Sequence, residues 1–209
     1  MSNTFCILSQ GFVVAAMEYR EMEIATFPAQ VEDVANAISH LETIADKFHM
    51  DMDRVFLAGN SCGGHIAMMA ALFNAHKLCT TFKKPNGIFI ESASTDLLTC
   101  AKAPLAPWMT IRPSAGLLGV DKIEGNEELA RRASCSMYID KEVDLPPILI
   151  LHGDADTVVS VENSRILYNK LIEAKKEVTY YELPGIGHCG APFWESEVIN
   201  VIKEFLRKL

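Results

Sequence analysis

The chain has 209 residues, of which 49% are hydrophobic and 22% are charged. This composition is typical of a globular protein with one substantial core and excludes the disordered and fibrous classes. The formal net charge of -8 argues against a nucleic-acid partner, because proteins that bind phosphate backbones concentrate Lys and Arg. From the length and composition we expect a single domain over residues 1–209 with one active site.

Cysteine usage and the N-terminal region indicate the cellular location. The six cysteines include no Cys-x-x-Cys pair, which argues against a zinc cage or a disulfide framework and favours a reducing cytoplasm. The apolar run at residues 12–17 has no basic residue before it and Glu18 after it, unlike a signal peptide. No run is long enough to cross a bilayer, so we expect no membrane partner.

The order of apolar patterns predicts the fold class. Helical spacing of apolar residues appears at residues 30–48 and 161–174. Strands buried on both faces read as short continuous apolar runs, and five such runs occur, at residues 11–19, 54–58, 87–90, 147–151 and 177–181. The alternation of the two patterns predicts an α/β fold with a doubly wound, mostly parallel sheet.

Residues 94–132 interrupt this alternation with three prolines and three glycines between short apolar pieces. We interpret this stretch as a small irregular cap or lid inserted into the single domain. Trp108 and Met109 within it are candidates for lining a substrate pocket, although a core of the cap accounts for them equally well. The shape of the cap would set the acyl and alcohol specificity.

A nucleophile elbow is predicted at residues 55–67, where a buried strand leads through Gly-Asn-Ser-Cys-Gly into a helix of small residues. Ser61 would sit in a strained turn, and we expect Gly59 and Gly63 to avoid Cβ clashes there. The backbone N–H of Cys62 would point at a developing oxyanion. A bare Gly-x-Ser-x-Gly match is weak, but the flanking strand and helix strengthen it.

Two further loops carry the candidates for the acid and the base. Asp156 follows the strand at residues 147–151, where open α/β sheets keep their sites, and Asp154 beside it is expected to cap the loop. His188 follows the last predicted strand in a glycine-rich loop. The remaining histidines are interpreted as ordinary surface residues: His40, His49, His65, His76 and His152.

The order Ser61, Asp156, His188 resembles that of the α/β-hydrolase superfamily. Glu18-Tyr19-Arg20 and the run from Pro146 to Gly153 are similar to motifs of its esterase and lipase branch, which is related to hormone-sensitive lipase and to bacterial xylan and feruloyl esterases. The resemblance implies hydrolysis of small carboxylic esters through an acyl-enzyme, with Ser61 as nucleophile, His188 as base and Asp156 as orienting acid. It implies no metal or organic cofactor.

The resemblance has a gap at its start. The family's His-Gly-Gly-Gly oxyanion loop and the strand before it have no counterpart, and the missing strand would lie between those expected at residues 11–19 and 54–58. The chain therefore resembles an N-terminally shortened family member. Two alternatives stay open: a peptidase of the prolyl-oligopeptidase type and a non-catalytic binding protein or remnant. Cys62 and Cys189 adjoin the candidate nucleophile and base, and small buried cysteines are expected there rather than redox sensors.

Overall fold

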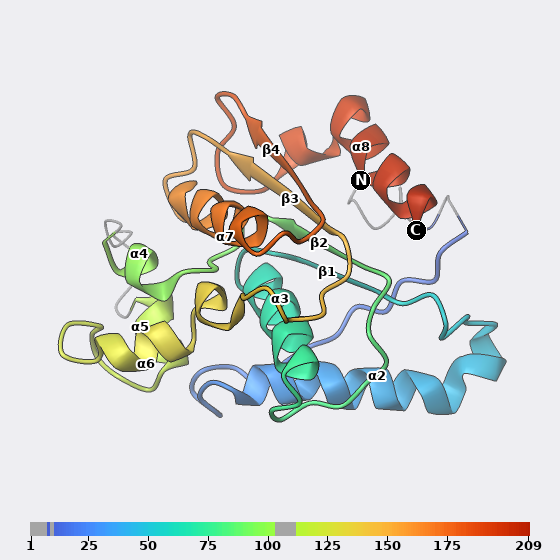
Figure 1. Cartoon of the computed structure of the whole chain (residues 1–209), viewed down its shortest axis with the longest axis horizontal. Helices are drawn as coiled ribbons and strands as arrows, with labels where there is room; N and C mark the ends of the chain where they lie inside the picture. Colours follow the sequence, from blue (N-terminus) through green and yellow to red (C-terminus); the bar gives the residue numbers. More distant parts are fainter. Residues whose placement is uncertain (1–7, 9–10, 103–111) are drawn as a thin grey trace.

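The structure is a computed structural model that describes Leu8, residues 11–102 and residues 112–209. Its centre is a parallel sheet in the order β1-β2-β3-β4 (Figure 1). The strands are β1 (Phe56–Asn60), β2 (Gly87–Glu91), β3 (Ile148–Gly153) and β4 (Val178–Leu183). Parallel neighbours require crossover connections, which here contain α3 (Ser61–Ala75) between β1 and β2 and α7 (Glu162–Glu173) between β3 and β4.

Helices cover both faces of the sheet, as a doubly wound fold requires. One face packs on α2 (Ala29–Phe48), α3 and α7, through Ile88, Ile90, Ile148 and Ile150. The alternate side chains Phe89, Leu149 and Leu151 face the other way, onto Phe193 and α8 (Ser196–Lys208). The predicted α/β fold is thereby confirmed, and α2 and α7 lie close to the two expected helices.

The segment at residues 11–19 corrects one prediction, because it is not a strand. Its apolar content reflects contact with the core: the Phe12 ring packs edge-on against Phe56 with 5.6 Å between centroids, and Met17 packs against the larger core cluster. A strand also needs ladder hydrogen bonds with a neighbour. Within the described residues β1 pairs only with β2, so the segment is extended without a ladder partner.

The insertion at residues 94–132 is more regular than expected. It contains α4 (Leu97–Lys102), α5 (Pro113–Leu117) and α6 (Glu127–Arg132), which lie together beside the sheet (Figure 1). These helices share a small core of their own, formed by Leu97, Ala115, Ile123, Ala130 and Ala133. Pro113 fits because the first turn of a helix needs no N–H donor there. Trp108 and Met109 lie outside the described residues.

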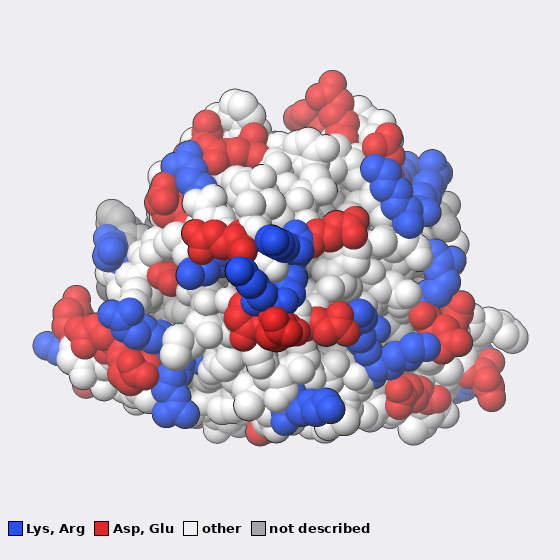
Figure 2. All heavy atoms as spheres, viewed as in Figure 1, with Lys and Arg blue, Asp and Glu red and all other residues white. Residues whose placement is uncertain are grey.

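On the face drawn in Figure 2, basic side chains alternate with acidic ones and form no extended field of one sign. Within the described part of the chain, none of the helices combines the length and the apolar character that crossing a membrane requires.

Candidate active site

The turn from β1 into α3 brings backbone segments into very close contact. A Cβ on Gly59 would lie 2.4 Å from the carbonyl carbon of Gly63, so this position accepts only glycine. The steric role expected of Gly63 is wrong, because a Cβ there would meet no atom within 4 Å. The second restricted position is Gly64, whose Cβ would approach that of Ala93 to 2.7 Å. Gly64 therefore allows α3 to pack against the segment after β2.

Ser61 is the first residue of α3 and has a φ of 50°, in the left-handed region that costs a non-glycine residue about 1–3 kcal/mol. This backbone directs the side chain away from the helix axis toward the loops that follow β3 and β4. The N–H of Cys62 lies in the first turn, where helix donors have no carbonyl partner within the helix. A polar donor and the positive end of the helix thus adjoin the Ser61 hydroxyl.

The loops after β3 and β4 are bonded to each other. A Cβ on Gly153 would lie 2.1 Å from the Ile186 carbonyl oxygen, so glycine is needed for the loops to approach. The same oxygen accepts the N–H of Ala155 at 3.0 Å. Asp154 caps the second loop, as expected, by accepting the N–H of Gly185 at 2.6 Å. These contacts fix the relative position of the side chains that the loops carry.

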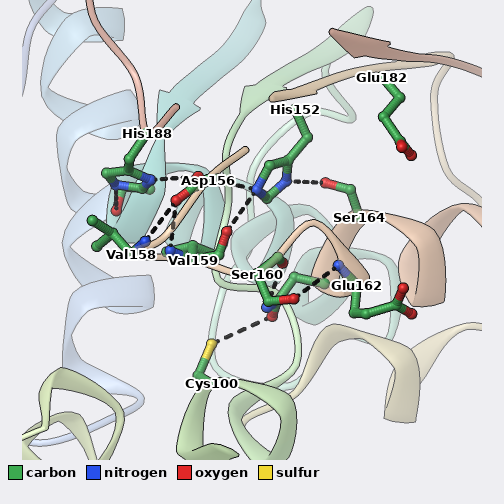
Figure 3. A network of polar contacts seen from close by, with 12 residues as sticks. Cys100, His152, Asp156, Val158, Val159, Ser160, Glu162, Ser164, Glu182 and His188 are labelled. Atoms are coloured by element: carbon green, nitrogen blue, oxygen red, sulfur yellow. Dashed lines mark hydrogen bonds and ion pairs between the residues drawn. The ribbon is translucent and has the colours of Figure 1, made fainter. Parts of the chain in front are cut away.

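Ser61, Asp156 and His188 come together in a continuous chain of hydrogen bonds. The Nδ1 of His188 lies 2.7 Å from Oδ2 of Asp156, and its Nε2 lies 3.1 Å from Oγ of Ser61. The other carboxylate oxygen, Oδ1, accepts the N–H groups of Val158 and Val159 at 2.8 and 2.9 Å (Figure 3). Since Nδ1 faces a carboxylate, it carries the proton, and Nε2 is left to accept the hydroxyl proton of Ser61.

The surroundings shift the pKa values of Asp156 and His188 in opposite directions. Burial alone would raise the pKa of Asp156, but hydrogen bonds from His152, His188 and two backbone N–H groups hold it far below its usual value. Burial alone would lower the pKa of His188, but hydrogen bonds with Asp156 and Cys189 raise it to about 9. The arrangement therefore stabilises an imidazolium beside a permanent carboxylate, as proton transfer from Ser61 would require.

Two histidines that were interpreted as surface residues are buried. His65 is 2% exposed, and its burial lowers its pKa. Its Nε2 lies 2.8 Å from the carbonyl oxygen of Ala133, which connects α3 to the segment after α6. His152 is 0% exposed and touches Asp156. The sequence carried a signal for His152, because it directly continues an apolar strand that is buried on both faces.

The two cysteines beside the site also differ from expectation. Cys62 is exposed and Cys189 is half-buried, so neither is the small buried residue that was expected. Cys62 follows Ser61, whose backbone is left-handed with a φ of 50°, and Cys189 is itself left-handed with a φ of 54°. Sharp turns at these positions direct the two side chains away from the core. Among the residues that the structure describes, no three His, Cys, Asp or Glu side chains are grouped to hold a metal ion.

The known proteins that this chain resembles include esterases. Esterase LipC of Mycobacterium tuberculosis is 28% identical over 87% of this chain and 46% of its own length. Isoprenylcysteine alpha-carbonyl methylesterase ICME of Arabidopsis thaliana is 25% identical over 84% of this chain and 43% of its own. The chain thus spans just under half the length of these relatives.

Solved structures show the same fold over nearly the whole chain. A truncated form of a carbohydrate esterase from gut microbiota superposes with a TM-score of 0.85 and 26% identity, covering 97% of this chain and 76% of the other. Esterase B from Lactobacillus rhamnosis gives a TM-score of 0.78 at 22% identity, covering 99% and 68%. The family model described as BD-FAE matches residues 1–171. The chain therefore belongs to the BD-FAE family, and its fold is that of the α/β-hydrolase esterases.

Proposed function

We propose that this protein hydrolyses small carboxylic esters, with Ser61 as nucleophile, His188 as general base and Asp156 as the orienting carboxylate. The observation that carries the proposal is the hydrogen-bonded chain of 2.7 and 3.1 Å that joins these three side chains. Such a chain suits acyl transfer because it activates a hydroxyl and stabilises the imidazolium formed when that hydroxyl reacts. The names of the relatives, esterases of several kinds, support the same class of substrate.

In the acylation step, Nε2 of His188 takes the proton of the Ser61 hydroxyl while Oγ attacks the ester carbonyl carbon. The oxyanion that forms accepts a hydrogen bond from the Cys62 N–H, and one such donor typically stabilises the transition state by about 2.7–4 kcal/mol. The tetrahedral intermediate then loses the alcohol, which leaves with the proton held by His188. The product of this half-reaction is an ester between the substrate acyl group and Ser61.

In the deacylation step, water replaces the alcohol and the same groups act again. His188 accepts a proton from the water, whose oxygen attacks the acyl carbon. The intermediate expels Ser61 Oγ, which recovers its proton from His188, and the carboxylic acid departs. Asp156 remains ionised throughout, because its pKa lies far below neutrality.

Turnover of p-nitrophenyl acetate, measured beside labelling by a fluorophosphonate, tests the proposal. We expect release of p-nitrophenolate and attachment of one phosphonyl group per chain, mapped by mass spectrometry to the peptide that contains Ser61. A peptidase of the prolyl-oligopeptidase type would instead prefer a prolyl amide. Absence of both labelling and turnover would reject the proposal and favour a binding protein.

The pH dependence of ester hydrolysis follows from the raised pKa of His188. Only the neutral imidazole accepts a proton, so the reactive fraction of free enzyme increases as pH rises toward a pKa of about 9. We expect kcat/KM to rise roughly tenfold per pH unit at neutral pH and to level off near pH 9. A profile measured from pH 6 to 10 that is flat below pH 8 would contradict this prediction.

A further inference from the structure

A second histidine, His152, lies against Asp156 on the side opposite His188 (Figure 3). It is the penultimate residue of β3 and is fully buried. Its Nε2 lies 3.2 Å from Oδ2 of Asp156, the same oxygen that His188 contacts at 2.7 Å. One carboxylate oxygen is thus held between two imidazole rings, one in β3 and the other in the loop after β4.

The partners of the His152 ring determine where its proton lies. Besides Asp156, Nε2 faces the Val159 carbonyl oxygen at 2.9 Å. Both neighbours can only accept, so Nε2 must carry a hydrogen. The other ring nitrogen, Nδ1, lies 2.7 Å from the hydroxyl of Ser164, a buried residue of α7 that can donate to it. A neutral ring with its proton on Nε2 satisfies all of these contacts.

We propose that His152 is a positioning residue for the Asp156–His188 pair: its Nε2–H, shared between Val159 and Asp156, holds the carboxylate in the orientation that His188 requires. This role deepens the proposed ester hydrolysis and rests on it, because its purpose is to keep the general base aligned with Ser61. His152 itself touches none of the reacting groups.

The carboxylate of Asp156 has no solvent to replace a lost partner. Its side chain is 0% exposed and its four contacts are two backbone N–H groups on Oδ1 and two imidazoles on Oδ2. Without His152, Oδ2 would keep only the contact with His188, and the Val159 carbonyl would lose its donor. The carboxylate could then pivot about Oδ1, which Val158 and Val159 still hold, and move Oδ2 away from His188.

Charged and titratable groups also surround the imidazole rings of His152 and His188, but the hydrogen bond between His152 and Asp156 is the contact that links the two rings. Glu182 of β4 interacts with His152 electrostatically, but it is neutralised by Arg165 of α7, whose guanidinium lies 2.5 Å from it. Cys189 is the additional titratable group that contacts His188. Neither Glu182 nor Cys189 is among the hydrogen-bond partners of the Asp156 carboxylate. Substitution of His152 should therefore affect His188 through Asp156.

Substitution of His152 by leucine removes the donor and fills its place in the buried strand with an apolar side chain. We expect the pKa of His188 to fall by about one pH unit or more, because the interaction that raises it weakens. We also expect kcat to fall by about 10- to 100-fold with KM nearly unchanged, as for other losses of alignment that affect only the transition state. His152→Gln, whose amide N–H can reach the Nε2 position, should restore most of both values.

Titration of the histidine rings by NMR, with ¹⁵N-labelled histidine, reads the pKa of His188 without requiring turnover. The matched control is Ile150→Val, which loosens the same buried strand two residues earlier without touching Asp156 and should leave that pKa unchanged. A His188 pKa in His152→Leu equal to that of the unsubstituted protein would overturn the proposal. So would equal falls in His152→Leu and Ile150→Val, which would indicate a merely structural role.

The same spectra of the unsubstituted protein provide a second test that does not depend on any variant folding. The ring of His152 should show its hydrogen on Nε2, and a bare Nε2 would exclude donation to Asp156. Failure of the chain to hydrolyse p-nitrophenyl acetate would count against the proposed function alone, because the tautomer of His152 and the pKa of His188 remain measurable. The two proposals are therefore separately testable.

Discussion

Replacing Ser61 by alanine is expected to reduce kcat for p-nitrophenyl acetate by roughly 10⁶-fold, the scale seen when the nucleophile of a serine triad is removed. The substitution deletes the Oγ that lies 3.1 Å from Nε2 of His188, so no acyl-enzyme can form. Any residual turnover would come from direct attack of water on the bound ester, with the Cys62 N–H stabilising the oxyanion. Initial rates over a long time course, corrected for buffer hydrolysis, measure the change.

The fold should survive the Ser61→Ala substitution. Alanine and serine have the same Cβ, so the strain of the backbone at a φ of 50° does not change and circular dichroism should match that of the unsubstituted protein. Ser160→Ala provides a matched control, since that partly exposed hydroxyl accepts the N–H of Glu162 at a long 3.3 Å. We expect full activity from it. Retention of more than about a tenth of the activity by Ser61→Ala would reject Ser61 as the nucleophile.

The parts of the site that could be predicted from the sequence are those encoded by local patterns. Four of the five expected strands form. The central strands β2 and β3 are buried on both faces and therefore read as continuous apolar runs, whereas β1 and β4, at the two ends of the described sheet, are partly exposed. Ser61, Asp156 and His188 follow three of those strands, and parallel strands end at one edge of a sheet, which brings distant loops together. The grouping of these residues therefore follows from topology.

The parts that could not be predicted depend on contacts distant in sequence. The need for glycine at Gly64 arises from Ala93, and nothing in the Gly-x-Ser-x-Gly pattern distinguishes it from the unrestricted Gly63. Residues 11–19 are apolar enough for a strand, but apolar content cannot show whether a hydrogen-bonding neighbour is present. The partners of His152 lie on α7 and in the loop before it, so only the folded chain brings them together.

Asp156→Asn is the second substitution for which we expect a very large loss, about 10⁴-fold in kcat. The backbone N–H groups of Val158 and Val159 would hold the amide oxygen where Oδ1 now lies. The amide NH₂ would then face the imidazoles of His152 and His188, both of which donate to Oδ2 in the unsubstituted protein. His188 could accommodate a donor only by accepting it at Nδ1, which moves its own proton to Nε2, opposite Ser61.

In that tautomer His188 cannot accept the Ser61 proton, so the loss would appear in kcat while KM changes little. The Nε2–H of His152 would meet the same NH₂ group and oppose it, which adds a loss of stability that thermal unfolding would detect. Asp154→Asn is the matched control, because it makes the same chemical change in the same loop and keeps an oxygen for the N–H of Gly185. If both variants lost activity equally, the loop as a whole would account for the effect; a loss confined to Asp156→Asn would assign it to the tautomer of His188.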